Sequence, residues 1–187
     1  HNVFYGTGTN PSIDWIGGII AGGFNNTIIE NNVFDGAYNA AVIHMYMPGY
    51  SSSYSPAGGY ITIVRNNIIV NTVKCKADPS GGYGVINNLP DTHSFVLQNN
   101  CLYNNIAGNY KNCNSTSDIY MDPLFADQKS HDYHLKSTAG RCNGNTWLQD
   151  SVNSPCIDVG CPSLDYSKEP EDNGDRNNIG RFGNTIY

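Results

Sequence analysis

Short apolar runs, each interrupted by a pair of asparagines, recur along the first two thirds of the chain. The clearest copy is NTIIENNVFDG (26–36), followed by ITIVRNNIIVNT (61–72) and SFVLQNNCLYNN (94–105). The second Asn of each pair recurs at spacings of 35 and 33 residues. β-Branched and aromatic residues favour strands, and a repeat of about this length without a helical pattern is typical of a solenoid or a propeller. The pattern therefore predicts short strands stacked in successive coils.

The Asn-Asn pairs favour a parallel β-solenoid, because each coil must bend at the same place and Asn tolerates the left-handed backbone conformation of such a bend. Gly- and Ala-rich runs at 16–23, 40–47 and 84–88 supply another strand per coil. We therefore predict an all-β, right-handed parallel β-helix with about three strands per coil. The first Asn of each pair (Asn31, Asn66 and Asn99) is expected to line the bend as a ladder.

Stacking the copies on their asparagines also predicts which residues superpose. One column should face outward, and its neighbour on the opposite face of the strand should face the core. The outward column is Glu30, Arg65 and Gln98, and the inward column is Ile29, Val64 and Leu97.

We expect one domain, with coils over residues 1–116 and an irregular C-terminal cap over 117–187. Insertions at 46–60 and 73–82 interrupt the coils, and such insertions often build the binding face of a solenoid. The chain opens in mid-repeat at Asn2–Gly6. We therefore expect it to be part of a longer protein whose N-terminal coils precede this sequence.

Composition narrows the function classes. The net charge of −6 over 187 residues disfavours a nucleic-acid partner, and no apolar run approaches the roughly 18 residues of a membrane span. Six cysteines fit an oxidising, extracellular or cell-surface location. We expect one local disulfide among Cys142, Cys156 and Cys161, and one or two within Cys75–Cys113. The Cys and His spacings match no zinc site, so we predict no metal centre.

A glycoside hydrolase needs two carboxyl groups beside the scissile bond. Asp14, Glu30 and Asp35 are the candidates on the predicted coil surface. The alternative is that these carboxylates are solvated surface groups.

A lyase needs a base and a cation that neutralises the uronate carboxylate. His44 could be the base, and Arg65, Lys74 and Lys76 are the candidate cations. His44 could equally be a hydrogen-bonded structural residue, Arg65 could pair with Glu30 across the coils, and the lysines could be solvated.

Aromatic side chains in the loops are the candidate substrate-binding residues, because tyrosine offers contact area at little entropic cost. They are Trp15, Tyr46, Tyr50 and Tyr54. Asp172 and Asp175 carry oxygens that suit calcium, but the rest of an EF-hand loop is absent.

Two resemblances support these expectations. The tail resembles the C-terminal part of secreted right-handed parallel β-helix proteins, through Asp122-Pro-Leu-Phe, Asp132-Tyr-His-Leu and Ser154-Pro-Cys-Ile-Asp-Val-Gly. The front, with GTGTNPSIDWIGGIIAGG (6–23) and NNTIIENNVFDGAYNAAVIHMY (25–46), is similar to the disaggregatase-related domain of methanogenic archaea.

The second resemblance implies a secreted or surface protein that acts on an acidic, uronate-containing matrix polysaccharide and so disperses cell aggregates. The other expectation that stays open is a non-catalytic, carbohydrate-binding surface module. Neither the residues nor the resemblance decides between a hydrolase and a lyase.

Overall fold

The computed structural model describes residues 1–7, 17–21, 26–45, 61–75, 78–89, 94–144, 146–170 and 174–185. No α-helix occurs in these ranges; strands and one 3-10 helix, Gln128–Ser130, make up the regular structure. The strands are β1 (Val3–Tyr5), β2 (Gly17–Ala21), β3 (Thr27–Glu30), β4 (Val33–Asp35), β5 (Ala40–His44), β6 (Ile61–Arg65), β7 (Ile68–Val70), β8 (Tyr83–Asn87), β9 (Ser94–Gln98), β10 (Cys101–Tyr103), β11 (Gly108–Lys111), β12 (Phe125–Asp127), β13 (Asp132–Leu135), β14 (Arg141–Asn143) and β15 (Thr146–Leu148).

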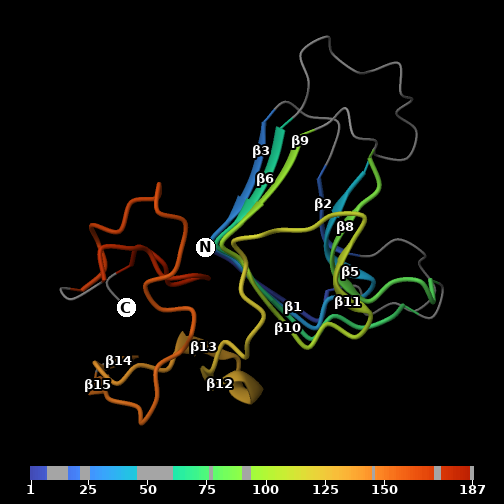
Figure 1. The fold of residues 1–187 in the computed structure, drawn as a ribbon. Helices are drawn as coiled ribbons and strands as arrows, with labels where there is room; N and C mark the ends of the chain where they lie inside the picture. Colours follow the sequence, from blue (N-terminus) through green and yellow to red (C-terminus); the bar gives the residue numbers. More distant parts are fainter. Residues whose placement is uncertain are drawn as a thin grey trace.

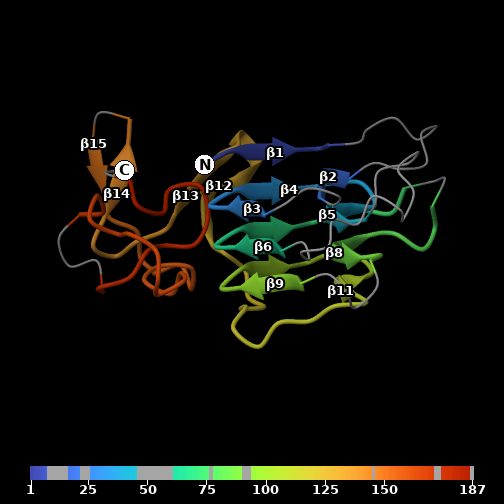
Figure 2. The same cartoon turned by 90° about the horizontal axis from the view of Figure 1, so that it is seen from above.

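Eleven of these strands form three parallel sheets: β1-β4-β7-β10, β2-β5-β8-β11 and β3-β6-β9. The chain visits the sheets in a fixed order three times, first through β3, β4 and β5, then β6, β7 and β8, then β9, β10 and β11. Figure 2 shows the strands side by side, and in Figure 1 the strands of each sheet overlap in projection. The predicted all-β class is therefore confirmed, and the sheets are parallel.

The register agrees with the predicted columns. Glu30 pairs with Arg65 and Arg65 with Gln98, while Ile29, Val64 and Leu97 form the adjacent, buried column. Successive side chains of a strand point to opposite faces, so the polar column faces away from the core.

Asparagines with positive φ angles make the bends, as predicted. Asn31, Asn66 and Asn99 have φ of 54°, 53° and 49° between the third and first sheets. A second series of bends follows the first sheet, where Gly6, Gly36, Asn71 and Asn104 are also left-handed. Non-Gly residues rarely adopt this conformation, and Asn does so most readily.

The side-chain ladder is formed by the second Asn of each pair, so its expected position is wrong by one residue. Asn32 donates through its backbone N and Nδ2 to Asn67 Oδ1, at 3.1 and 3.0 Å. Asn67 donates in the same way to Asn100 Oδ1, at 3.0 and 3.1 Å. These side chains are buried, and each amide therefore both accepts from one rung and donates to the next.

Asp118 ends this ladder. Its carboxylate accepts from the backbone N and Nδ2 of Asn100, at 2.9 and 3.1 Å, and from the Tyr110 hydroxyl. A carboxylate only accepts hydrogen bonds, so it satisfies the last donors without requiring a further rung.

The interior between the three sheets is apolar. Phe34 is fully buried and stacks on Phe4 with a ring separation of 4.7 Å. The residues around it are small or branched, including Ala41, Val64 and Ile69. Burial of these side chains supplies the main force that holds the sheets together.

The C-terminal segment packs over the outer face of the β1-β4-β7-β10 sheet, and Figure 1 shows it to one side of the sheets (orange to red). Phe125, Tyr133 and Ile179 bury themselves against Val33 and Ile68. This segment carries two antiparallel pairs, β12-β13 and β14-β15. Both faces of β4 are consequently covered, and all three of its residues are buried.

No disulfide joins any two cysteines of the described ranges. The expected local pair among the last three cysteines is therefore absent, as are the pairs within Cys75–Cys113. Cys156 instead lies beside Cys101 of β10, in one apolar cluster. The Cys101 thiol and burial together raise the pKa of the Cys156 thiol well above its usual range.

Candidate functional site

The predicted outward pair of Glu30 and Arg65 forms an ion pair. Arg65 Nε lies 2.8 Å from Glu30 Oε2, and the side chains are 19% and 37% exposed. The positive charge of the Arg65 guanidinium neutralises the negative charge of the Glu30 carboxylate. Because these two groups satisfy each other, they do not provide the two-carboxyl arrangement of a hydrolase.

Asp35 is not on an open surface, which corrects its expected placement. It is 5% exposed beneath the C-terminal segment. Its carboxylate accepts from Asn71 Nδ2, Gln128 Nε2 and Tyr133 Oη at 2.8, 2.9 and 3.0 Å. These three donors come from the adjacent bend and from the C-terminal segment, so Asp35 connects that segment to the sheet.

His44 is fully buried on β5 and does not share a groove with Glu30. Its ring stacks on Phe95 with a centroid separation of 4.5 Å, and Nδ1 lies 3.0 Å from Asn87 Oδ1. The structure therefore places this imidazole in the interior, where a polymeric substrate does not reach it.

The remaining predicted residues are scattered or fall outside the described ranges. Lys74 and Asp175 are exposed, and no group of metal-ligating side chains occurs in the part of the chain that the structure describes. The residues outside the described ranges are Asp14, Trp15, Tyr46, Tyr50, Tyr54, Lys76 and Asp172.

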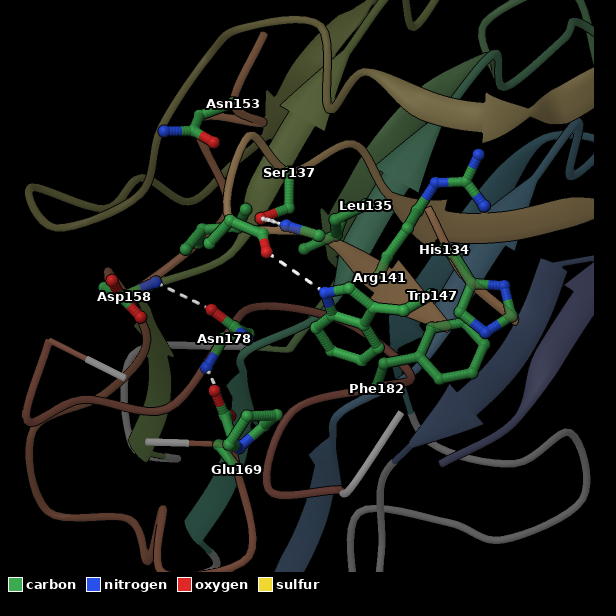
Figure 3. Close-up of a pocket in the computed structure, with 14 residues that line it drawn as sticks. His134, Leu135, Ser137, Arg141, Trp147, Asn153, Asp158, Glu169, Asn178 and Phe182 are labelled. Carbon is green, nitrogen blue, oxygen red and sulfur yellow. Dashed lines mark hydrogen bonds between the residues drawn. The ribbon is translucent and has the colours of Figure 1, made fainter. Parts of the chain in front are cut away.

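A cleft of about 400 Å³ opens in the C-terminal segment instead. Figure 3 shows side chains from β13, β14, β15 and the last loops around it. Its lining consists of His134, Leu135, Ser137, Ala139, Gly140, Arg141, Trp147, Asn153, Ile157, Asp158, Glu169, Pro170, Asn178 and Phe182.

Two acidic residues on one side of the cleft, Asp158 and Glu169, both contact Asn178. Glu169 Oε1 accepts from the backbone N of Asn178 at 2.8 Å, and the backbone N of Asp158 donates to Asn178 Oδ1 at 2.7 Å. Burial raises the pKa of Asp158, and burial together with the charge of Asp158 raises the pKa of Glu169. Perturbed carboxyl groups in a cleft are characteristic of functional sites.

Close backbone packing brings the Asp158 carboxyl group into place. Asp158 is itself left-handed, with φ of 58°. A Cβ added to Gly174 would lie 2.6 Å from the Asp158 carboxyl atoms, so only glycine fits against them.

The indole of Trp147 forms the facing wall and is held rigidly. Its Nε1 donates to the carbonyl of Ala139 at 3.1 Å. A Cβ on Gly140 would lie 1.9 Å from Nε1, so the ring packs directly on the glycine backbone. The side chain nevertheless remains 55% exposed. A fixed, accessible aromatic surface is suited to stacking against a flat apolar ligand face.

Arg141 and His134 complete the lining of the cleft, but both side chains are already paired with aspartates. Arg141 Nε lies 2.9 Å from Asp150 Oδ2, and its Nη1 is 3.7 Å from Asp132 Oδ2. His134 pairs with Asp132 and stacks on Phe182 with a ring separation of 3.9 Å. The cleft therefore combines stacking surface with acidic, hydrogen-bonding groups.

Sequence reasoning missed this site. Asp158 lies in the Ser154-Pro-Cys-Ile-Asp-Val-Gly motif, which carries a resemblance of fold, and Trp147 lies in the part of the chain that is expected to form an irregular cap. One usable signal was present: a tryptophan close to a glycine and followed by acidic residues in a polar, loop-rich region.

Comparisons with known proteins complement this geometry. No curated protein and no solved structure matches the chain. In the part that the structure describes, no helix is long and apolar enough to cross a membrane. A family model described as disaggregatase related matches residues 1–160, which include Trp147 and Asp158 but not Glu169. The chain belongs to the disaggregatase-related family.

Proposed function

We propose that this chain is an extracellular glycan-acting domain, part of a disaggregatase-like protein that degrades an acidic matrix polysaccharide, and that the C-terminal cleft binds the sugar. The juxtaposition in one cleft of an exposed, fixed indole with two carboxyl groups, buried Glu169 and partly buried Asp158, whose pKa values are raised carries this proposal. Family membership supports the glycan-related role.

We also propose that the three sheets form a right-handed parallel β-helix. The fixed order in which the chain visits them and the continuous asparagine ladder support this architecture. Such a scaffold gives a long, rigid body that can lie along a polymer, while the cleft contacts individual sugar rings.

The chemistry of the cleft suits a saccharide. The apolar face of a sugar ring stacks on an indole, and its hydroxyl groups exchange hydrogen bonds with carboxyl oxygens. A carboxyl group whose pKa is raised keeps its proton to higher pH, as the general acid of a glycosidase requires. The indole and the carboxyl oxygens of the cleft therefore support sugar binding, and the raised pKa values of its carboxyl groups also support acid catalysis.

A non-catalytic carbohydrate-binding module is the second candidate. The observations that favour it are the burial of His44 and Asp35 and the mutual pairing of Glu30 with Arg65. His44 and Asp35 are enclosed, and Glu30 and Arg65 are engaged with each other.

Replacing the indole tests the site. Trp147→Ala should weaken binding to a soluble uronate-containing polysaccharide at least about 10-fold, because loss of a stacking anchor typically costs more than 1 kcal/mol. Isothermal titration calorimetry measures the affinity. Tyr103→Ala, which removes a 40% exposed aromatic from β10, is the matched control and should bind normally.

Unchanged binding by the Trp147 variant, or no binding by the wild type, would overturn the assignment of the cleft. Chain length of the polysaccharide and absorbance of unsaturated ends, followed in the same samples, separate the functions. Shortening without new absorbance indicates a hydrolase, shortening with it a lyase, and binding without shortening the non-catalytic module.

A further inference from the structure

A line of hydrogen-bonding side chains runs from a buried carboxylate to the surface at the turn before β13. Tyr133 Oη donates to Asp35 Oδ2 at 3.0 Å and lies 3.4 Å from His131 Nδ1. Tyr133 and Asp35 are 3% and 5% exposed, whereas His131 is on the surface. An enclosed acid is thus linked through a phenol to an accessible imidazole.

The direction of these hydrogen bonds selects one imidazole tautomer. Because the Tyr133 hydroxyl gives its single proton to Asp35, its oxygen can only accept from His131 Nδ1–H. Burial and the Asp35 carboxylate both raise the pKa of Tyr133, so the phenol stays protonated. A neutral imidazole with its proton on Nδ1 carries a lone pair on Nε2. The hydrogen bonds from His131 through Tyr133 to Asp35 therefore leave Nε2 unprotonated, as a base requires.

A second phenol lies beside this base. The rings of Tyr5 and His131 have centroids 4.1 Å apart at an interplanar angle of 60°. Tyr5 belongs to β1 and is 60% exposed, so a tyrosine ring and an imidazole from distant parts of the chain meet at one surface. His131 also has a left-handed backbone, with φ of 61°, and such strained residues cluster at functional sites.

We propose that His131 and Tyr5 form a proton-transfer centre that cleaves uronate-containing glycans by β-elimination, with Tyr133 and Asp35 as positioning residues. This centre lies outside the C-terminal cleft, and the proposal rests on the proposed glycan-acting function. It assigns to the chain a lyase activity in addition to sugar binding.

The elimination balances without a co-reactant. His131 Nε2 takes the proton from the carbon next to the uronate carboxylate, and that electron pair forms the new carbon–carbon double bond. The glycosidic bond to the neighbouring carbon breaks, and its oxygen leaves with a proton from the Tyr5 hydroxyl. Proton exchange with water then restores both side chains.

The charges around the imidazole are compatible with this step. Tyr5 of β1 and Tyr133 of β13 lie against it, and Asp35 of β4, the neighbour of β1 in the same sheet, is linked to it through Tyr133. In its own turn lie Asp127, whose carboxylate caps Ser130, the exposed Lys129, and Asp132, which pairs with His134. Lys129 is the cation of this turn that could offset the uronate charge as the intermediate forms.

Asparagine at the base position gives a clean test. His131→Asn keeps a residue that tolerates the left-handed conformation but removes the base. It should lower the rate at which unsaturated ends form from a uronate-containing polysaccharide about 100-fold or more. His1→Asn, which replaces another exposed histidine, is the matched control and should leave the rate unchanged. Equal thermal unfolding of the variants shows that the fold is retained.

Tyr133→Phe tests the positioning role. Without the phenol oxygen, the Nδ1–H of His131 loses its acceptor and the tautomer is no longer fixed, so kcat for the formation of unsaturated ends should fall while KM and glycan affinity stay the same. A merely structural Tyr133 would lower the thermal stability and leave kcat of the folded protein unchanged. That result would overturn its assigned role.

The outcomes separate this proposal from the one it rests on. Glycan binding that depends on Trp147, without unsaturated ends, overturns the elimination centre and leaves the sugar-binding function standing. Unsaturated ends formed at an equal rate by the His131 variant also overturn it. Absence of glycan binding by the wild type contradicts the proposed function itself.

Discussion

Glu169 has an enclosed carboxyl group although it belongs to a polar, irregular stretch of sequence. It is 7% exposed, and its Oε1 accepts from the backbone N of Asn178 and of Asn184 at 2.8 and 2.7 Å. Burial and the Asp158 charge outweigh these two donors and raise the pKa of Glu169. The folded protein therefore binds this proton more tightly than the unfolded chain does.

This linkage predicts how stability depends on pH. A raised folded-state pKa contributes stability below the ordinary glutamate value of about 4.3 and loses it as pH rises through the folded-state value. Glu169→Gln keeps the accepting oxygen but cannot ionise. The free energy of unfolding of the variant should equal that of the wild type at low pH and exceed it as pH increases. Urea unfolding from about pH 4 to pH 7 measures this difference. A constant difference across that range would contradict the pKa assignment.

Local conformation was predictable residue by residue, whereas burial was not. Asn66 and its equivalents could be placed at bends because tolerance of a positive φ is a property of asparagine itself. The burial of Asp35 and His44 depends on what packs above each strand. Asp35 is covered by Gln128 and Tyr133, which lie 93 and 98 residues away along the chain. No local sequence pattern predicts such contacts.

Among the elements, the asparagine ladder joins the strand pairs into one body. Asn67 accepts two hydrogen bonds from Asn32 and donates two to Asn100, and its Nδ2 also donates to the carbonyls of Ile29 and Arg65 at 2.9 and 2.8 Å. The repeat predicted a ladder here. The offset by one residue arises because the first Asn of each pair makes the bend, and its side chain turns toward the C-terminal segment, as Asn66 does to Asn177 at 2.8 Å.

An aspartate in the ladder should show what the amide donors contribute. Asn67→Asp is nearly isosteric, but it buries a charge and leaves two carbonyls without a donor. We expect the free energy of unfolding to fall by about 3 kcal/mol or more. Asn104→Asp, at an exposed bend where Nδ2 donates only to Asn71, should lose less than about 1 kcal/mol. Equal losses in guanidinium titrations would show that the ladder donors contribute no more than a surface amide.

At the scale of the whole molecule, the C-terminal segment is part of the sheet body rather than an appendage. Ile179 is 1% exposed in the cluster that contains Val33, Ile68 and Phe125. Gly180 N donates to Asn66 O, and Asn99 Nδ2 donates to Val159 O. Sequence periodicity could not place the segment over a sheet face, since that placement depends on contacts such as that of Asn66 with Asn177, which are 111 positions apart.

Truncating the central contact should therefore destabilise sheets and segment together. Ile179→Ala removes a fully buried branched side chain, which typically costs about 3 kcal/mol and lowers Tm by roughly 10 °C in a chain of this size. Far-UV circular dichroism reports the sheets. In a Trp15→Phe background, tryptophan fluorescence reports the surroundings of Trp147 in the C-terminal segment. The two transitions should move to lower temperature by the same amount and remain superimposed, because the cluster is shared. Val152→Ala, at a 44% exposed position of the same segment, serves as the control and should shift neither. A fluorescence transition that precedes the loss of the sheet signal would mean that the segment unfolds on its own. The C-terminal cleft would then be a detachable element instead of one fixed by the sheets.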